Sequence, residues 1–294
     1  QIFPTDISES NTQLLSLKST QYKIDKLLNG TIIDINTVSA SDKPKIVTAI
    51  VPIQSKGKDF LNDITTESTI TYGDYYLPHQ TVVKTNNDYA INTTTLEYVH
   101  NINGTGKDYY VGRPQSKTET VFYSPTSDTK SAKQEYTYNA NNLLETLKTY
   151  NRDDSGWFLE TYTYDDFGNI TQKEITNSID DNTKTDKAEY DAKGRFVLKK
   201  TDNLGLETNI TYNDSGQVLT QTDTFGNTLT NEYDDWGKLL KSKTNLSGNT
   251  SYTYEKFSNG DAVVNEYAPD GGRVITYTNK FGQKYKSAAK AFGQ

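Results

Sequence analysis

The sequence predicts an all-β protein, an elongated and twisted antiparallel sheet of β-hairpins that repeat about every 22 residues. The first observation is a regular spacing of glycines: from Gly194 to Gly293 they recur at steps of 10 to 12 residues. A strand of about six residues and a tight turn of about four fill such a step. A helix would not tolerate this spacing, because glycine weakens helices and favours turns with positive φ.

The second observation is that the segments between glycines alternate between two kinds. One kind continues from glycine into apolar residues and ends in Thr-Asp, as at 216–223, and the other ends in Tyr followed by Asp or Asn, as at 226–234. The repeating unit is therefore a hairpin rather than a single strand. Repeats of this length rely on their neighbours to bury their faces.

The third observation is the composition. Only 33% of residues are hydrophobic, yet the chain has 22 Tyr, 10 Phe and 2 Trp, which suit a half-buried pleated surface. The net charge of −7, with basic residues scattered among acidic ones, argues against nucleic-acid binding. No apolar stretch is long enough to span a bilayer, and the absence of cysteine excludes disulfides and thiolate chemistry.

The N-terminal part is the least regular. We expect residues 1–65 to form an irregular β-rich cap or arm, and residues 66–294 to form the hairpin repeats, which continue beyond the chain end. Within the cap, residues 10–28 predict a short helix or an extended arm, and residues 46–51, between Pro44 and Pro52, predict a short buried strand. Residues 54–63 predict a surface loop.

Alternating strands follow from residue 65, at 69–72, 80–84, 91–98, 117–123 and 133–138. The segment Asn139-Ala-Asn-Asn142 takes the place of a glycine turn, because Asn tolerates left-handed backbone nearly as well. Further turns are predicted at 153–156, 165–168 and 177–183.

Four turns carry a family resemblance: Tyr164-Asp-Asp-Phe-Gly168, Tyr190-Asp-Ala-Lys-Gly194, Tyr212-Asn-Asp-Ser-Gly216 and Tyr233-Asp-Asp-Trp-Gly237. They resemble the Tyr-Asp (YD) repeats of Rhs-family proteins, and residues 111–120 resemble the segment that leads into such repeats. The family includes bacterial polymorphic toxins, shell-forming components of insecticidal toxin complexes and the teneurins. The resemblance covers roughly residues 110–294.

This resemblance implies that the sheet spirals as part of a hollow shell around a C-terminal toxin or effector domain. The partners would be the remainder of the longer chain or that cargo domain, with an export or surface protein as a further candidate. Gln1 is not a translation start, which indicates a removed signal peptide or a trimmed chain. A secreted or cell-surface protein is expected.

The search for chemistry predicts no catalytic, cofactor-binding or metal residues, and no cofactors. The two histidines, His79 and His100, lack metal-ligand spacing and are expected to make ordinary hydrogen bonds. The carboxylate pairs Asp165-Asp166, Asp180-Asp181 and Asp234-Asp235 could bind Ca²⁺ or act as acid and base. Two of these pairs lie in turns, where Asp usually accepts hydrogen bonds from its own backbone.

Aromatic residues suggest two further interpretations. Seven tyrosines at strand ends predict a ladder of aromatic contacts on one face, with a sugar-binding strip as the alternative: Tyr138, Tyr164, Tyr190, Tyr212, Tyr233, Tyr254 and Tyr277. Four residues before turn glycines are expected to staple each turn to its neighbour: Phe167, Phe225, Trp236 and Phe281.

Taken together, the residues and the resemblance predict a non-catalytic structural segment. The alternative is a cell-surface adhesion or carbohydrate-binding module. The tyrosines discriminate between the two, since a shell wall would bury them and a binding module would expose them in a groove.

Overall fold

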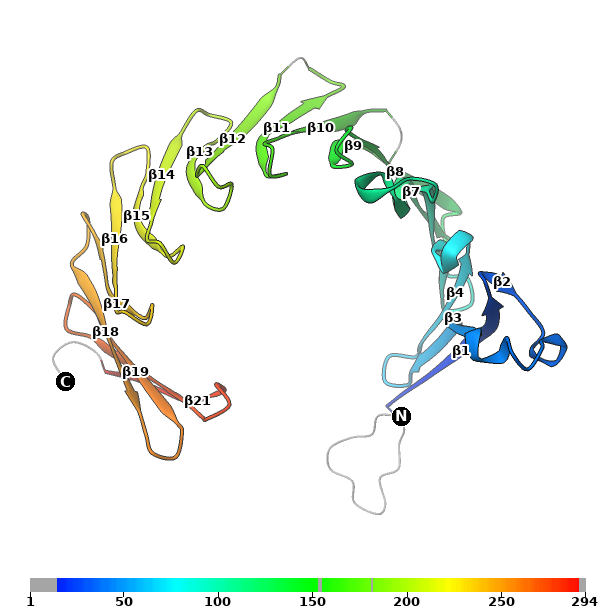
Figure 1. Ribbon diagram of the computed structural model, residues 1–294, viewed down its shortest axis with the longest axis horizontal. Coiled ribbons are helices and arrows are strands. Elements are labelled where there is room, and N and C mark those ends of the chain that lie inside the picture. The colour runs from blue at the N-terminus through cyan, green and yellow to red at the C-terminus, as the bar shows by residue number, and fades with distance from the viewer. Residues whose placement is uncertain (1–14, 153–154, 181, 291–294) are drawn as a thin grey trace. The chain divides into compact units, whose positions relative to one another are not determined.

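A computed structural model describes residues 15–152, 155–180 and 182–290. They form 21 β-strands and four 3-10 turns of three residues each (Figure 1). The strand pairs are antiparallel throughout both units described below, for example β4 with β5 and β16 with β17. The predicted all-β antiparallel repeat is confirmed. The predicted turn at 153–156 and the residue Asp181 lie wholly or partly outside the described residues.

Residue contacts divide the chain into two units. The first unit contains the chain up to Thr161 and also Thr176–Asn182. Its strands follow in chain order from β1 outward, with β2 on the far side of β1. They are β1 (Ser16–Leu28), β2 (Thr31–Ile32), β3 (Val47–Asp59), β4 (Ile64–Tyr72), β5 (Pro78–Thr85), β6 (Ala90–Asn101), β7 (Tyr110–Tyr123), β8 (Asp128–Tyr138), β9 (Leu144–Tyr150) and β10 (Trp157–Tyr164). The 3-10 turns are η1 (Ile35–Thr37), η2 (Lys43–Lys45), η3 (Asp74–Tyr76) and η4 (Gly106–Asp108).

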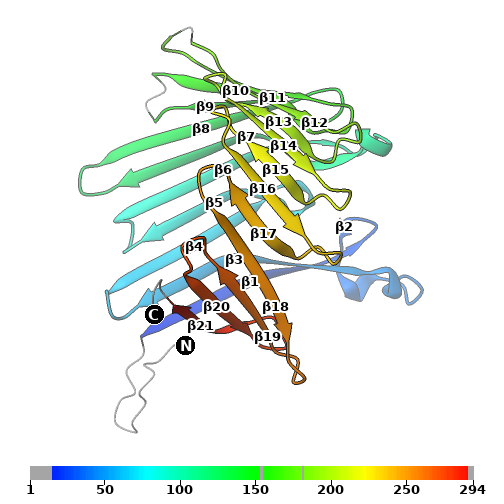
Figure 2. The ribbon, with the colours of Figure 1, turned by 90° about the vertical axis from the view of Figure 1, so that its left-hand side faces the viewer.

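The second unit contains Tyr162–Ile175 and the chain from Thr183 onward. Its strands from β11 pair in chain order as a meander, seen from one side in Figure 2. They are β11 (Ile170–Asn177), β12 (Lys184–Tyr190), β13 (Val197–Thr201), β14 (Glu207–Tyr212), β15 (Val218–Thr222), β16 (Thr228–Tyr233), β17 (Leu239–Thr244), β18 (Asn249–Lys256), β19 (Ala262–Tyr267), β20 (Arg273–Thr278) and β21 (Lys284–Lys290). The division of the chain into 1–65 and 66–294 stays a prediction.

The N-terminal elements differ in part from expectation. Of the two alternatives for residues 10–28, the described part is extended rather than helical, because β1 is a strand of 13 residues that pairs along its length with β3, also of 13 residues. The predicted loop 54–63 is wrong as far as Asp59, because those residues belong to β3. The strand around 46–51 is not buried, since Val47 and Ile50 are 66% and 60% exposed. Pro52 is tolerated inside β3 because it lies at a bulge opposite Tyr22.

The glycine spacing corresponds to a turn of one kind. In the turn at 223–226, the Gly226 N–H donates to the Asp223 carbonyl (3.0 Å), and the Asp223 N–H donates to the Asn227 carbonyl (3.0 Å). The glycine has φ of +79°, a conformation that other residues adopt only with strain. Gly248 is an exception, because it does not take positive φ.

The sheet is thin. The chain exposes 19944 Å², whereas a compact protein of this length exposes about 12,500 Å². Among the described residues, Ile210 and Val263 are the only buried apolar side chains, at 8% and 5% exposure. Each unit is therefore stabilised by strand pairing and contacts along its faces more than by a central core.

Each unit has one face that carries the strand-end tyrosines and one that carries many threonines. Alternation along the strands and the pairing register place Tyr72, Tyr98 and Tyr138 on one face of the first unit. The same reasoning places Tyr190, Tyr212, Tyr233 and Tyr254 on one face of the second. We call this the tyrosine face and the opposite side the threonine face.

Candidate functional site: the tyrosine face, the turns and an open groove

The phenol groups on the tyrosine face donate hydrogen bonds to backbone carbonyls of preceding strands. In the first unit these bonds are Tyr72 to Pro52 (2.7 Å), Tyr98 to Pro78 (3.0 Å) and Tyr138 to Pro114 (2.8 Å). In the second unit they are Tyr190 to Ile170 (3.2 Å), Tyr212 to Val197 (3.0 Å), Tyr233 to Val218 (3.0 Å) and Tyr254 to Leu239 (2.8 Å). We call this series the tyrosine–carbonyl relay.

The relay is tied to β-bulges. Tyr212 pairs with Val218 where the register of β14 and β15 shifts, and the Val218 carbonyl then accepts from Tyr233. Tyr233 likewise pairs with Leu239 at a shift, and the Leu239 carbonyl accepts from Tyr254. A bulge leaves backbone groups outside the regular ladder. Each tyrosine therefore donates to the carbonyl of a bulge residue, and that bulge residue is the pairing partner of the previous tyrosine in the series.

Partial burial accompanies these bonds. Burial raises the pKa of Tyr98, and burial is also the main cause that raises the pKa of Tyr138 and Tyr254. The neutral phenol, which can donate, is therefore the form that this environment favours.

The predicted ladder of ring contacts is replaced by these phenol–carbonyl bonds. The prediction that Tyr277 shares a face with Tyr254 is wrong. Tyr254 pairs with Val264 and Val264 pairs with Thr276, which places the next residue, Tyr277, on the opposite face. The reason is that β18 and β19 pair without a bulge, so the register does not shift back.

The paired carboxylates serve their own turns. Asp165 Oδ1 accepts from the N–H groups of Phe167 and Asn169, both at 2.9 Å. Asp234 Oδ1 accepts from those of Trp236 (3.0 Å) and Lys238 (2.7 Å). Burial acts to raise the pKa of Asp165, but the hydrogen bonds outweigh it, and the pKa lies below its ordinary value.

The third pair is split. Asp180 accepts from the Asn177 side chain (2.9 Å), while Asp181 lies outside the described residues. In the part of the chain that the structure describes, no three His, Asp or Glu side chains converge as metal ligands would.

The histidines lie on adjacent strands and make separate contacts. His79 Nδ1 is 3.2 Å from the Leu96 carbonyl, and His100 Nδ1 accepts from the Gly112 N–H at 2.9 Å. The His100 ring also packs 4.9 Å from the ring of Tyr75. These contacts match the ordinary hydrogen bonds that the sequence predicts, and they provide neither a nucleophile–base pair nor a metal site.

The sequence did not predict a polar cluster around Arg113. The Arg113 guanidinium lies 3.5 Å from the ring centre of Tyr110 and 4.6 Å from that of Tyr138. Arg113 Nη1 donates to Asn142 Oδ1 (2.8 Å), and Lys107 Nζ donates to Asn141 (3.0 Å). The loops between β6 and β7 and between β8 and β9 are thereby joined. The family resemblance of residues 111–120 marked this segment, but the sequence could not show its contacts. Arg113 binds Asn142, which lies 29 residues later in the chain.

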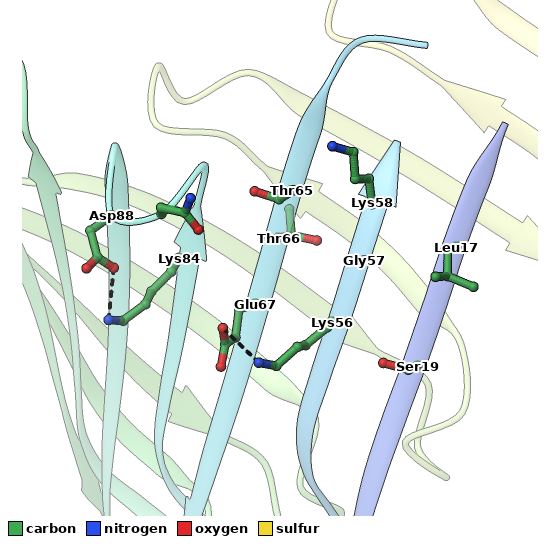
Figure 3. A pocket seen from close by; sticks show the side chains of 11 residues that line it. Leu17, Ser19, Lys56, Gly57, Lys58, Thr65, Thr66, Glu67, Lys84 and Asp88 are labelled. Carbon is green, nitrogen blue, oxygen red and sulfur yellow. Dashed lines mark ion pairs between the residues drawn. The ribbon is translucent and has the colours of Figure 1, made fainter. Parts of the chain in front are cut away.

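An open groove of about 570 Å³ lies on the threonine face of the first unit (Figure 3). Its floor is a cross-strand row of charges, Lys56, Glu67 and Lys84, with Lys56 Nζ 3.4 Å from Glu67 Oε2. Lys84 pairs with Asp88 at 2.8 Å, which raises the pKa of that lysine. The lining residues include no aromatic ring to hold a sugar. The groove's lining carries three lysines, Lys56, Lys58 and Lys84, and two carboxylates, Glu67 and Asp88.

Three of the predicted turn staples are exposed. Phe225, Trp236 and Phe281 are 80%, 89% and 75% exposed, so the prediction is wrong for them. Phe167 differs from these three. Its ring lies against the turn that contains Gly194, so close that a Cβ on Gly194 would collide with it. Among the described residues, no helix is long and apolar enough to cross a membrane.

Comparisons with known proteins support the fold. No family model matches the chain, and no curated protein matches it significantly in sequence. The chain is similar to the crystal structure of TcdB2-TccC3, with a TM-score of 0.65 and 10% identity over 98% of this chain and 21% of that one. It is also similar to TcdB2-TccC3 without its hypervariable C-terminal region, with a TM-score of 0.64 and 9% identity over 98% of this chain and 23% of that one.

The chain thus spans about a fifth of the length of these structures. At this identity the likeness concerns the fold. The chain has the antiparallel β-repeat fold found in TcdB2-TccC3, in agreement with the Rhs-like fold that the Tyr-Asp turns predict.

Proposed function

We propose that this chain is a non-catalytic wall segment of an Rhs-type β-shell, and that the shell encloses or presents a C-terminal effector or toxin. The observation that carries the proposal is the tyrosine–carbonyl relay in a sheet with the fold of TcdB2-TccC3. The remainder of a longer chain, or an enclosed cargo domain, would be the partner, and the protein would act outside the cell or at its surface.

The relay gives a thin sheet the stiffness that a wall needs. Each phenol connects its strand to a carbonyl of a preceding strand in addition to the ladder hydrogen bonds. A hydrogen bond of this kind contributes about 1 kcal/mol, and its repetition resists sliding between strands without a second layer.

The threonine face suits contact with an enclosed polypeptide that must not bind to the wall. Its hydroxyl groups bond one another, as in Thr211 with Thr220 (2.6 Å) and Thr222 with Thr228 (3.0 Å). Its charges are paired across strands, as in Lys199 with Glu207 (2.7 Å). Such a surface offers few free donors or apolar patches to an unfolded chain.

The alternative, a carbohydrate-binding module, lacks comparable support. A sugar-binding strip needs exposed aromatic faces and free polar groups beside them. On the tyrosine face, Tyr138, Tyr212 and Tyr233 are half-buried and their phenols already donate to carbonyls.

Limited proteolysis of the full-length gene product tests the proposal. We expect the segment C-terminal to this chain to resist protease until the wall is opened by the double substitution Tyr212→Phe and Tyr233→Phe. Digestion of that segment at the same rate in both proteins would contradict a shell. Specific binding of this chain to immobilised glycans, abolished by the same substitutions, would favour the adhesion module instead.

A further inference from the structure

β1 is the edge strand of the first unit (Figure 1). One side of β1 pairs with β3 from Ser16 to Leu27, whereas on the other side β2 pairs only with Leu27 and Leu28. Within the described ranges, no strand pairs with residues 16–25 on that second side. A free edge of this length offers backbone donors and acceptors to an added strand.

The side chains along this edge form a pattern. Residues 18, 20, 22, 24 and 26 point to one face because side chains alternate along a strand. Lys18 and Lys26 thus flank the apolar pair Tyr22 and Ile24, which are 57% and 59% exposed. Ile50 of β3, paired with Ile24 and 60% exposed, extends the apolar strip.

The charge around the edge is positive. Residues 16–59 contain seven lysines and four aspartates, although the whole chain has a net charge of −7. Four of these lysines are ion-paired, Lys23, Lys45, Lys56 and Lys58, which leaves Lys18 and Lys26 as the unpaired cations of β1 among the described side chains. Asp25, the one acidic residue of β1, already pairs with Lys23 (2.7 Å) and accepts from the Tyr76 phenol (2.8 Å). Among the described side chains, neither Lys18 nor Lys26 forms an ion pair with a carboxylate.

This charge selects among possible occupants. Edge lysines oppose the addition of a second copy through the same strand, because like charges would face each other. Pairing of β1 with the β21 edge of a second copy is disfavoured for the same reason, since β21 carries Lys284, Lys286 and Lys290. An acidic segment would meet complementary charge instead.

We propose that the free edge of β1 is a docking site for an extended acidic segment of a partner protein. The segment adds to the sheet through backbone hydrogen bonds, with aliphatic side chains over Tyr22 and Ile24 and carboxylates beside Lys18 and Lys26. This inference goes beyond the shell proposal and does not depend on it.

Fluorescence anisotropy with a labelled, capped peptide, Glu-Thr-Val-Thr-Val-Thr-Val-Thr-Glu, tests the site on the chain of residues 1–294. We expect saturable binding that weakens with salt and that protects the amides of residues 16–25 from hydrogen exchange. The double substitution Lys18→Glu and Lys26→Glu should weaken binding roughly tenfold. The matched control at the other edge strand, Lys284→Glu with Lys286→Glu, should leave it unchanged.

Two further peptides separate the contributions. A peptide with Lys in place of both Glu should bind far more weakly, and one with N-methylated backbone amides should not bind. Equal binding of the acidic and basic peptides, or loss of binding in the β21 control alone, would overturn the proposal. Unchanged binding in the Lys18 and Lys26 variant would overturn it as well.

Discussion

The two contact units build the same tyrosine–carbonyl relay on different strand lengths. Between β3 and β8 the accepting residues are prolines, 20 to 24 residues before the tyrosine. Between β13 and β18 they are Val or Leu, 15 residues before it. The bulge and its tyrosine are kept while the strands and loops between them change length. The relay, rather than strand length, is thus the common structural unit.

The units differ more in their turns. The second unit repeats four-residue turns that end in a left-handed glycine, as at Gly216 and Gly226. The first unit makes the same hydrogen-bond pattern at 139–142 with Asn142, at φ of +64°, and elsewhere uses longer loops with left-handed Tyr75 and Tyr76. Glycine and asparagine therefore both supply the left-handed residue that closes this turn, glycine without strain and asparagine at a small cost.

The largest expected effect on stability comes from replacing turn glycines of the second unit. Two such replacements separate the cost of backbone strain from the cost of side-chain crowding. Gly216→Val should destabilise the protein by about 3 kcal/mol, because a Cβ would lie 2.6 Å from the Phe196 ring in addition to the backbone strain. Gly226→Val should cost only about 1.5 kcal/mol, since no atom lies within 4 Å of its Cβ position. Urea unfolding measures both. Equal losses would show that crowding at Gly216 is unimportant.

The relay should contribute equally in both units. Tyr98→Phe and Tyr212→Phe each remove one phenol–carbonyl bond and should lower the free energy of unfolding by about 1 kcal/mol. Tyr22→Phe is the control, because Tyr22 is 57% exposed and has no phenol hydrogen bond among the described residues. A loss confined to one unit would contradict the common relay.

Acid should loosen turns closed by Asp and spare those closed by Asn. The hydrogen bond from Asn227 is the main cause that holds the pKa of Asp223 below its ordinary value. A lowered folded pKa stabilises the turn above the unfolded pKa, and this stabilisation is lost as the pH falls through the folded pKa. The protection factors of the Phe225 and Asn227 amides, which correct for the intrinsic slowing of exchange in acid, should therefore fall between about pH 6 and about pH 3.

The turn at Asn213 provides the control, because its amide side chain accepts the same bonds, from Ser215 (3.1 Å) and Gln217 (2.9 Å), without titrating in this range. Asp223→Asn should remove the pH dependence of its own turn. Equal loosening of the Asn213 turn would show that acid acts elsewhere.

The smallest expected effect is that of a chelator. EDTA should leave the melting temperature unchanged, because Asp165 and Asp234 already accept backbone N–H groups. A lower melting temperature in EDTA, restored by Ca²⁺ and absent in Asp234→Asn, would instead identify a calcium site in these turns.

Much of the second unit was predictable from sequence, because its information is local. A left-handed glycine and an Asp or Asn that accepts nearby N–H groups specify a turn within five residues, as at Asp234 to Lys238. The full length of the N-terminal strands was not predicted, because it depends on contacts between residues far apart in the sequence. β1 and β3 are 13-residue strands because they pair with each other, and Pro52 interrupts the local pattern that would have shown it.

The candidate surfaces were predictable only in part. The tyrosines could be found by their spacing, but their acceptors could not, since the register and bulges between strands decide which carbonyl each phenol reaches. The Arg113 cluster and the charged row Lys56, Glu67 and Lys84 likewise join residues from different strands, and their local sequence carries no sign of the partner.

The sequence by itself determined the β-class, the turn positions and the alternation of polar and aromatic residues, because these depend on backbone preferences over a few residues. Only the tertiary structure decided which face Tyr277 occupies and which carbonyl Tyr254 binds. The physical reason is the period of two in a strand. A single bulge, present between β16 and β17 and absent between β18 and β19, shifts the register by one residue and moves each following side chain to the other face.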